Sequence, residues 1–198
     1  MRLVSLGCLL FFAACGGAEE DSNASAPNLP KALGQISAEI AAPTEKQMEE
    51  FGSLAQYVGT TFKGAPTGDS SEKFVDIQKW EWGLDGRTIL IRHALVDGSY
   101  GGDTHVYKDA KTGKLTYVYI TSGGYHTVGE MTPNATGWVA EEEVVGHETI
   151  TRVRSTSVVD EDGVWTMNSE YLTDGEWVAG HAFEYAETDD PLPKITIE

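Results

Sequence analysis

The fold of this chain is decided by the stretch FVDIQKWEW at residues 74–82, which is followed by GLDG at 83–86 and RTILIRH at 87–93. The two outer runs are rich in aromatic and β-branched residues, a composition typical of β-strands. Asp85 and Gly86 lie between them and are a strong turn signal, because the residues of a tight hairpin turn need positive φ angles. The stretch therefore predicts an antiparallel β-hairpin.

The same pattern repeats along the chain to about residue 186. Gly, Asp, Asn and Pro mark turns roughly every 8–12 residues, with no helical pattern between them. Such an antiparallel up-and-down meander closes into a barrel, because closure removes exposed sheet edges. We therefore expect an all-β fold, an antiparallel up-and-down barrel of about ten strands that is wide enough to hold a cavity. The strands are expected at 58–64, 72–83, 87–95, 102–109, 114–122, 124–132, 138–146, 149–159, 164–173 and 177–186.

A short helix is expected before the barrel. Thr44 precedes Glu45-Lys46-Gln47 in a capping-box arrangement, and apolar side chains then recur at helical spacing. The apolar face consists of Met48, Phe51, Leu54 and Ala55. We expect this amphipathic helix to cap one end of the barrel, so that residues 43–188 form one domain and 189–198 a C-terminal tail.

The first residues read as a bacterial lipoprotein signal. A short positive start and an apolar run predict a signal peptide over residues 1–14. The run Phe12-Ala13-Ala14-Cys15 resembles a lipobox, in which the cysteine is acylated and becomes the first residue of the mature protein. Residues 15–42 then supply the lipidated cysteine and a polar, flexible tether. We expect the protein to be held on the lipid bilayer through acylated Cys15, in the cell envelope on the periplasmic side of the outer membrane.

The charge of the chain limits its partners. It has 14 Lys and Arg against 31 Asp and Glu, a formal net charge of −17 at pH 7. Nucleic-acid phosphates would be repelled by this surface, so we expect no nucleic-acid partner. Cys8 is expected to leave with the signal peptide and Cys15 to carry lipid, so no thiol would remain for a disulfide, a zinc site or a nucleophile.

Alternation along the strands predicts which side chains face the barrel interior. On 149–159, Val153, Ser155 and Ser157 are expected inside, with Arg152 and Arg154 outside. Strand 114–122 is apolar on both faces, so its phase is left open. The other predicted inner faces are Trp80 and Trp82; Ile89, Ile91 and His93; Trp138, Ala140, Glu142 and Val144; Trp165, Met167 and Tyr171; and Trp177, Ala179, His181, Phe183 and Tyr185.

Three ionisable residues, His93, Glu142 and His181, share these apolar faces. A buried imidazole or carboxyl needs a partner or a solvated cavity. One interpretation is a small-molecule pocket with a few polar anchors; the other is three residues at the rim or satisfied internally. The predicted ligand-binding set is Trp80, His93, Tyr125, Glu142, Trp165 and His181. No nucleophile elbow or dense metal-ligand spacing occurs, so no catalytic or metal residue is predicted.

The run Gly59-Thr60-Thr61-Phe62-Lys63-Gly64, after a short helix and before an uninterrupted meander, resembles the calycin superfamily, which includes the lipocalin-like and nitrobindin-like barrels. The likeness is greatest to uncharacterised bacterial barrels, many of them lipidated. Phe62 stands where the family motif has tryptophan, with one extra residue in the spacing. The resemblance implies a cavity for lipids, retinoids, haem or other small molecules. In nitrobindin-like proteins a histidine near the C-terminal end of the barrel ligates haem iron, and His181 lies in a comparable place.

The leading hypothesis is a membrane-anchored lipoprotein whose barrel binds a small apolar or amphipathic molecule, with no catalysis and no cofactor. The first alternative is a haem or metal binder that uses His181. The second is an acid–base enzyme that uses His93, His181 and Glu142. The third is a structural envelope protein with a filled barrel. The sequence favours a binding protein over an enzyme.

Overall fold

A computed structural model describes residues 44–67 and 74–196. The predicted signal peptide (1–14), the predicted lipidation site Cys15 and the whole of the expected tether lie outside the described residues, so these assignments stay predictions. Within the described part of the chain, no helix has the length and apolar character needed to cross a membrane.

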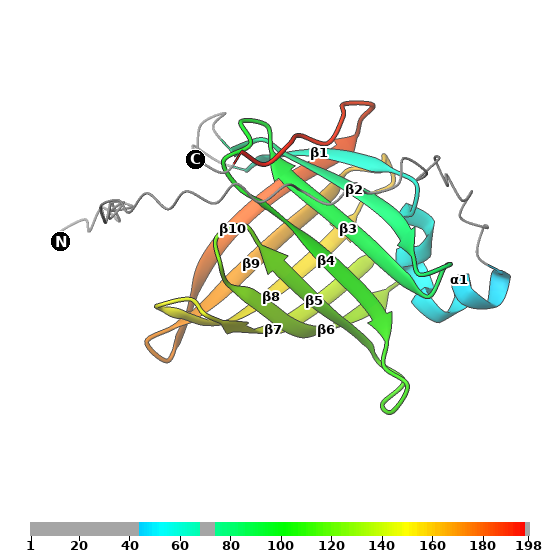
Figure 1. Cartoon of the computed structure of the whole chain (residues 1–198), viewed down its shortest axis with the longest axis horizontal. Helices are drawn as coiled ribbons and strands as arrows, with labels where there is room; N and C mark the ends of the chain where they lie inside the picture. The colour runs from blue at the N-terminus through cyan, green and yellow to red at the C-terminus, as the bar shows by residue number, and fades with distance from the viewer. Residues whose placement is uncertain (1–43, 68–73, 197–198) are drawn as a thin grey trace, which may run out of the picture. The chain divides into compact units, whose positions relative to one another are not determined.

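The described chain forms a closed antiparallel barrel of ten strands, which confirms the predicted fold (Figure 1). Each strand pairs with the next one along the chain, and the last pairs with the first. The α-helix α1 (Glu45–Phe51) and the 3₁₀-helix η1 (Gly52–Tyr57) precede the barrel. The strands are β1 (Thr61–Pro66), β2 (Asp76–Gly83), β3 (Thr88–Leu95), β4 (Gly101–Lys108), β5 (Leu115–Thr121), β6 (His126–Asn134), β7 (Gly137–Val145), β8 (Ile150–Val159), β9 (Trp165–Thr173) and β10 (Glu176–Glu187).

The first hairpin forms as the sequence predicts. β2 and β3 pair antiparallel, with Trp80 opposite Ile91. The turn begins one residue before the predicted Asp-Gly pair, since Leu84 (φ 48°), Asp85 (φ 54°) and Gly86 (φ 79°) all have positive φ. The amides of Gly86 and Arg87 both donate to the carbonyl of Gly83 at 3.1 Å. A leucine therefore occupies a left-handed position that normally favours Gly, Asn or Asp.

The segment before the barrel covers one end of it, as expected (Figure 1). It is not one continuous helix, because Gly52 has a φ of +58° and the chain continues as the 3₁₀ turn η1. Phe51 and Leu54 are buried. The Phe51 ring meets the edge of Trp82 at 5.5 Å, and the Tyr57 ring lies 5.7 Å from Trp80. Apolar burial against these rings holds the segment on the barrel end.

The observed register confirms most of the predicted inner faces. Val153 of β8 lies opposite Glu142, while Arg154 pairs outside with Glu170. The sequence left open which face of β5 points inward, and the structure shows that it is the tyrosine face, because Tyr117 and Tyr119 line the interior cavity. Ile120, on the other face, is exposed.

The predicted inner face of the last strand is wrong at its start. A β-bulge between Ala179 and Ala182 shifts the register of β10 against β9. Phe183, after the bulge, lines the interior. Trp177, before it, lies against the guanidinium of Arg154, an outward residue, at 4.3 Å. One extra residue in a bulge reverses the alternation, so a single period cannot hold along the whole strand.

We expect Leu84→Asn to raise the free energy of unfolding by about 0.5–1 kcal/mol, because asparagine tolerates the left-handed conformation that costs leucine about 1–2 kcal/mol. Urea denaturation measures it. The matched control is Leu84→Ala, which also removes exposed apolar surface but lacks the amide group by which asparagine tolerates a positive φ. If both variants gain the same stability, the cause is the loss of exposed apolar surface and not the backbone conformation.

Candidate ligand-binding cavity

The barrel contains a cavity of about 980 Å³. One end is covered by α1 and η1, next to the β2–β3 turn. In an up-and-down barrel the alternate loops lie at the opposite end, and residues of those loops, among them Thr67, Ser99 and His147, line the cavity. The cavity therefore extends from the capped end toward these loops. Its volume is at the upper end of the range for small-molecule sites, about 300–1,000 Å³.

The capped end is packed with aromatic rings, and we call Tyr57, Phe62, Trp80, Trp138 and Trp165 the aromatic floor. Trp138 lies 5.6 Å from Trp80 and 5.0 Å from Trp165, and Phe62 meets Trp165 edge-on at 5.7 Å. Trp80 and Trp165 are only 1% and 3% exposed. Their indole N–H groups are covered and have no hydrogen-bond partner in the described chain. The floor thus offers a ligand an apolar aromatic surface.

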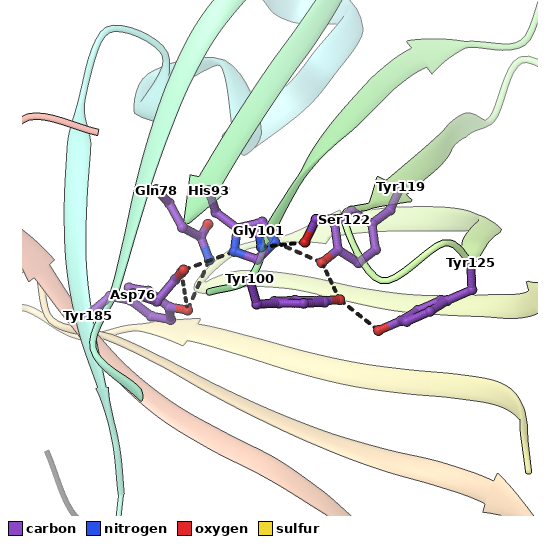
Figure 2. Close-up of polar contacts among 9 residues, drawn as sticks. All are labelled: Asp76, Gln78, His93, Tyr100, Gly101, Tyr119, Ser122, Tyr125 and Tyr185. Atoms are coloured by element: carbon purple, nitrogen blue, oxygen red, sulfur yellow. Dashed lines mark hydrogen bonds and ion pairs between the residues drawn. The ribbon is translucent and has the colours of Figure 1, made fainter. Parts of the chain in front are cut away.

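Above the floor, a buried carboxyl anchors a polar network. Asp76, at the start of β2, is 3% exposed. Tyr185 of β10 donates its hydroxyl to Asp76 Oδ2 at 3.0 Å, and His93 Nδ1 of β3 lies 2.9 Å from Asp76 Oδ1. Gln78 in turn donates to the Tyr185 hydroxyl at 3.0 Å (Figure 2). Both oxygens of Asp76 are therefore hydrogen-bonded, which offsets the cost of burying this carboxyl.

The network continues as a chain of tyrosines across β4, β5 and the loop before β6. His93 Nε2 lies 2.7 Å from the Tyr119 hydroxyl, which is 3.0 Å from that of Tyr100. The Tyr100 hydroxyl is 2.6 Å from that of Tyr125 (Figure 2). We call this series, Asp76, His93, Tyr119, Tyr100 and Tyr125, the Asp76–Tyr125 chain. It leads from the buried carboxylate to a tyrosine on the cavity wall.

With an ionised Asp76 and a neutral His93 ring, the hydrogen bonds of this chain have one consistent direction. A carboxylate only accepts, so His93 donates from Nδ1, and in the neutral ring Nε2 then accepts from Tyr119. Tyr119 in turn accepts from Tyr100, and Tyr100 from Tyr125. Every hydroxyl proton then points toward Asp76, and Tyr125 presents oxygen lone pairs to the cavity. Hydrogen bonds in such a series polarise one another, which makes this last oxygen a better acceptor.

Glu142 of β7 supplies a second carboxyl to the cavity wall. The Thr127 hydroxyl donates to it, and Tyr117 is a second hydrogen-bonding neighbour. Burial raises the pKa of Glu142 above its usual range, and these two hydrogen bonds only partly oppose the rise. The folded protein therefore holds the proton of this carboxyl more tightly than the unfolded chain does.

His181 lines the cavity at the bulge of β10. Its Nδ1 is hydrogen-bonded with the Tyr171 hydroxyl of β9, and its backbone carbonyl accepts from Ser169 at 2.7 Å. No partner is found for Nε2 within the described chain. Burial lowers the pKa of His181, partly offset by the charge of Asp76, and this favours the neutral ring.

The structure brings the predicted ligand-binding residues together. All six line the same cavity: Trp80, His93, Tyr125, Glu142, Trp165 and His181. His93, Glu142 and His181 are each hydrogen-bonded to different partners: Asp76 and Tyr119, Thr127, and Tyr171 respectively. The acid–base hypothesis needs these three groups to act on the same atoms. Among the described residues no hydrogen bond joins them, while His93 and His181 lie near enough for their charges to interact.

Sequence reasoning missed Asp76, Tyr100, Tyr119 and Tyr185 as members of a polar site. Asp76 lies four residues before Trp80 and therefore on the same face of the strand, so the alternation already indicated that its side chain points inward. Glycines on the inner face are another sequence signal, because they leave room for a large side chain of a neighbouring strand. A Cβ on Gly102 would lie 2.6 Å from the Tyr119 ring, so this strand position must stay bare for the ring to lie there.

Among residues 44–67 and 74–196, no three His, Cys, Asp or Glu side chains are grouped closely enough to hold a metal ion. The chain matches no model of a known protein family and no curated protein sequence. The closed ten-stranded antiparallel barrel fits a calycin-like fold in general terms.

The raised pKa of Glu142 predicts a pH-dependent stability. An acid whose pKa is raised on folding stabilises the fold below its unfolded pKa, about 4.3, and this contribution is lost as pH rises through the folded value. Relative to Glu142→Gln, wild type should therefore lose stability as the pH rises from about 4 until it passes the folded pKa of Glu142, by about 1.4 kcal/mol for each unit of the shift. Urea denaturation of both proteins across this range measures it.

The control is Glu143→Gln, the same substitution one residue along β7 on the exposed outer face. Its effect should be smaller than that of Glu142→Gln throughout the range. A constant difference between wild type and Glu142→Gln at every pH would mean that the carboxyl is as well solvated in the folded state as in the unfolded chain.

Proposed function

We propose that this protein is a lipid-anchored envelope protein whose barrel binds a small amphipathic molecule without chemically changing it. The observation that carries the proposal is the cavity of about 980 Å³, with an aromatic floor at one end and hydrogen-bonding groups on the walls above it. A predominantly apolar cavity with a few placed polar groups is the usual composition of a small-molecule site. A barrel that served only as a structural element would need no such space.

The two parts of the cavity suit the two parts of an amphiphile. Apolar surface buried against the floor contributes about 25 cal/mol per Å², and aromatic rings add dispersion. Tyr125, Glu142 and His181 are then within the same cavity to orient a polar head. His93, Glu142 and His181 are hydrogen-bonded to separate partners and not to one another among the described residues, which supports binding over catalysis.

The anchoring part of the proposal is supported by the sequence. Residues 12–15 match the lipobox pattern except at Phe12, and the residues after Cys15 are polar and small, as a tether requires. Each acyl CH₂ buried in a bilayer contributes about 0.8 kcal/mol, so several chains on one cysteine hold a protein firmly. Mass spectrometry of the mature N-terminus would show the acylated cysteine.

A cavity-filling substitution tests the binding function. Ser155 lies on the inner face of β8 and lines the cavity, whereas its neighbour Thr156 is exposed outside. Ser155→Phe should reduce the affinity for a single-chain amphiphile such as decanol by about tenfold or more, because the ring occupies ligand volume. Quenching of the floor tryptophans reports binding, and Thr156→Phe is the matched control. Equal affinities in all three proteins would place the ligand outside the barrel.

Haem binding through His181 is the second candidate, and a specific observation favours it. Tyr171 holds Nδ1 of His181, while Nε2 has no partner among the described residues. A ligating histidine is typically held in this way by a bond at its other nitrogen. The depressed pKa also favours the neutral ring that binds iron. Against it, the described cavity lining has no Lys or Arg to pair with haem propionates, and for this reason the first proposal takes precedence.

Haem titration separates the two candidates. If His181 ligates iron, adding haem to the protein should give a shifted Soret band that Ser155→Phe weakens and His181→Ala abolishes, because the axial nitrogen is lost. Phe183→Ala, a change at a neighbouring lining residue, should leave the band position unchanged. A band that survives in His181→Ala, or no shift in wild type, rules out this ligation.

A further inference from the structure

We propose that the head group recognised in this cavity is a cation, an ammonium group, and that anionic amphiphiles such as fatty-acid carboxylates are discriminated against. This inference rests on the proposed binding function and specifies its ligand. It starts from the charges on the cavity wall. The described lining contains two carboxyls, Asp76 and Glu142, and neither lysine nor arginine.

The two interior carboxyls have no permanent cation as a partner. Glu142 is held by the hydroxyls of Thr127 and Tyr117. Asp76 is held by the Tyr185 hydroxyl and by His93. A buried carboxyl gains most from an opposite charge nearby, because Coulomb energies are larger where water is partly excluded. The described cavity wall therefore offers these carboxyls no lysine or arginine, and a cationic ligand could supply the missing positive charge.

The histidines of the cavity do not make up for this charge. His93 is paired with Asp76, so the pair carries no net positive charge in either protonation state of the ring. His181 has a pKa lowered by burial and is favoured as the neutral ring. At the loop end, His147 Nδ1 is already engaged, because it accepts the backbone N–H groups of Thr149 and Ile150.

The tyrosines add two features that suit a cation. With an ionised Asp76 and a neutral His93, the Asp76–Tyr125 chain orients its hydroxyl protons toward Asp76, so that Tyr125 presents an acceptor oxygen to the cavity. Tyr119, Tyr125 and Tyr171 also place aromatic rings around the same space. Ring faces attract cations by about 0.5–2 kcal/mol, and they repel anions for the same electrostatic reason. Acceptor oxygens and ring faces thus favour an ammonium head over a carboxylate.

The cationic side chains of the barrel lie elsewhere. Arg152 and Arg154, on the outer face of β8, pair with Glu141 and Glu170. Lys114 pairs outside with Glu130. Strand alternation places these charged side chains in solvent, where each ion pair contributes little to stability. The inner face of β8 is occupied by the uncharged side chains of Val153 and Ser155.

The test compares three amphiphiles with the same tail and different heads: decylammonium, decanol and decanoate. Each is titrated into the full chain at about pH 7 and low ionic strength, below its micelle concentration, with tryptophan fluorescence as the readout. We expect decylammonium to bind about tenfold or more tightly than decanoate, with decanol between them. Decanoate binding as tightly as decylammonium overturns the cation inference and leaves the carrier function standing. Binding of none of the three overturns the carrier function itself.

A charge-removing variant locates the effect. Glu142→Gln should lower the affinity for decylammonium severalfold and leave that for decanol unchanged. Glu143→Gln removes the same charge from the outer face of the same strand and should change neither. Equal losses in both variants would assign the preference to the overall charge of −17 and overturn the assignment to the cavity. If Glu142→Gln does not fold, the three-ligand comparison on wild type still overturns the inference when decanoate binds as tightly as decylammonium.

Discussion

The pairing of β1 with β10 is the constraint on which the rest of the structure depends. It closes the sheet, and it places Gly64 opposite Tyr185 on one side and Asp76 on the other. A Cβ on Gly64 would lie 2.3 Å from the Tyr185 ring, so this position must be bare for the ring to cross the seam. Tyr185 then reaches Asp76 and stacks on Trp165 at 4.4 Å. Barrel closure, the aromatic floor and the Asp76–Tyr125 chain are therefore coupled through one side chain.

The interior is divided because the two ends of the barrel are packed differently. The turn at Gly52 brings Leu54 and Tyr57 over the strand ends, where the rings of Trp80 and Trp138 complete a packed layer. No described element covers the loop end in the same way, and the side chains there are linked by hydrogen bonds instead of close apolar packing. An apolar region and a polar region thus follow one another along a single cavity, an arrangement suited to a molecule that is itself amphipathic.

Charge is divided between the faces of the sheet by the same alternation that builds the core. On β8, Arg152 and Arg154 point into solvent and meet outer carboxylates, while Val153 and Ser155 face the cavity. On β7 the alternation instead sends one of three consecutive glutamates, Glu142, inward. A chain with a large excess of acidic residues thereby keeps interior carboxyls without interior lysine or arginine within its described part. The chemistry of the cavity follows from this unequal division more than from any single residue.

The sequence by itself determined the number of strands, their order and most of their inner faces, because turn residues and the two-residue period are local signals. It also indicated six residues that do line one cavity, among them Glu142 and His181. Tertiary structure alone decided the phase of β5, which is apolar on both faces, and the reversal at Trp177, which a bulge in β10 causes. It also decided the Asp76–Tyr125 chain, whose contacts join different strands. Such contacts depend on register and on closure of the sheet, and no local pattern encodes either.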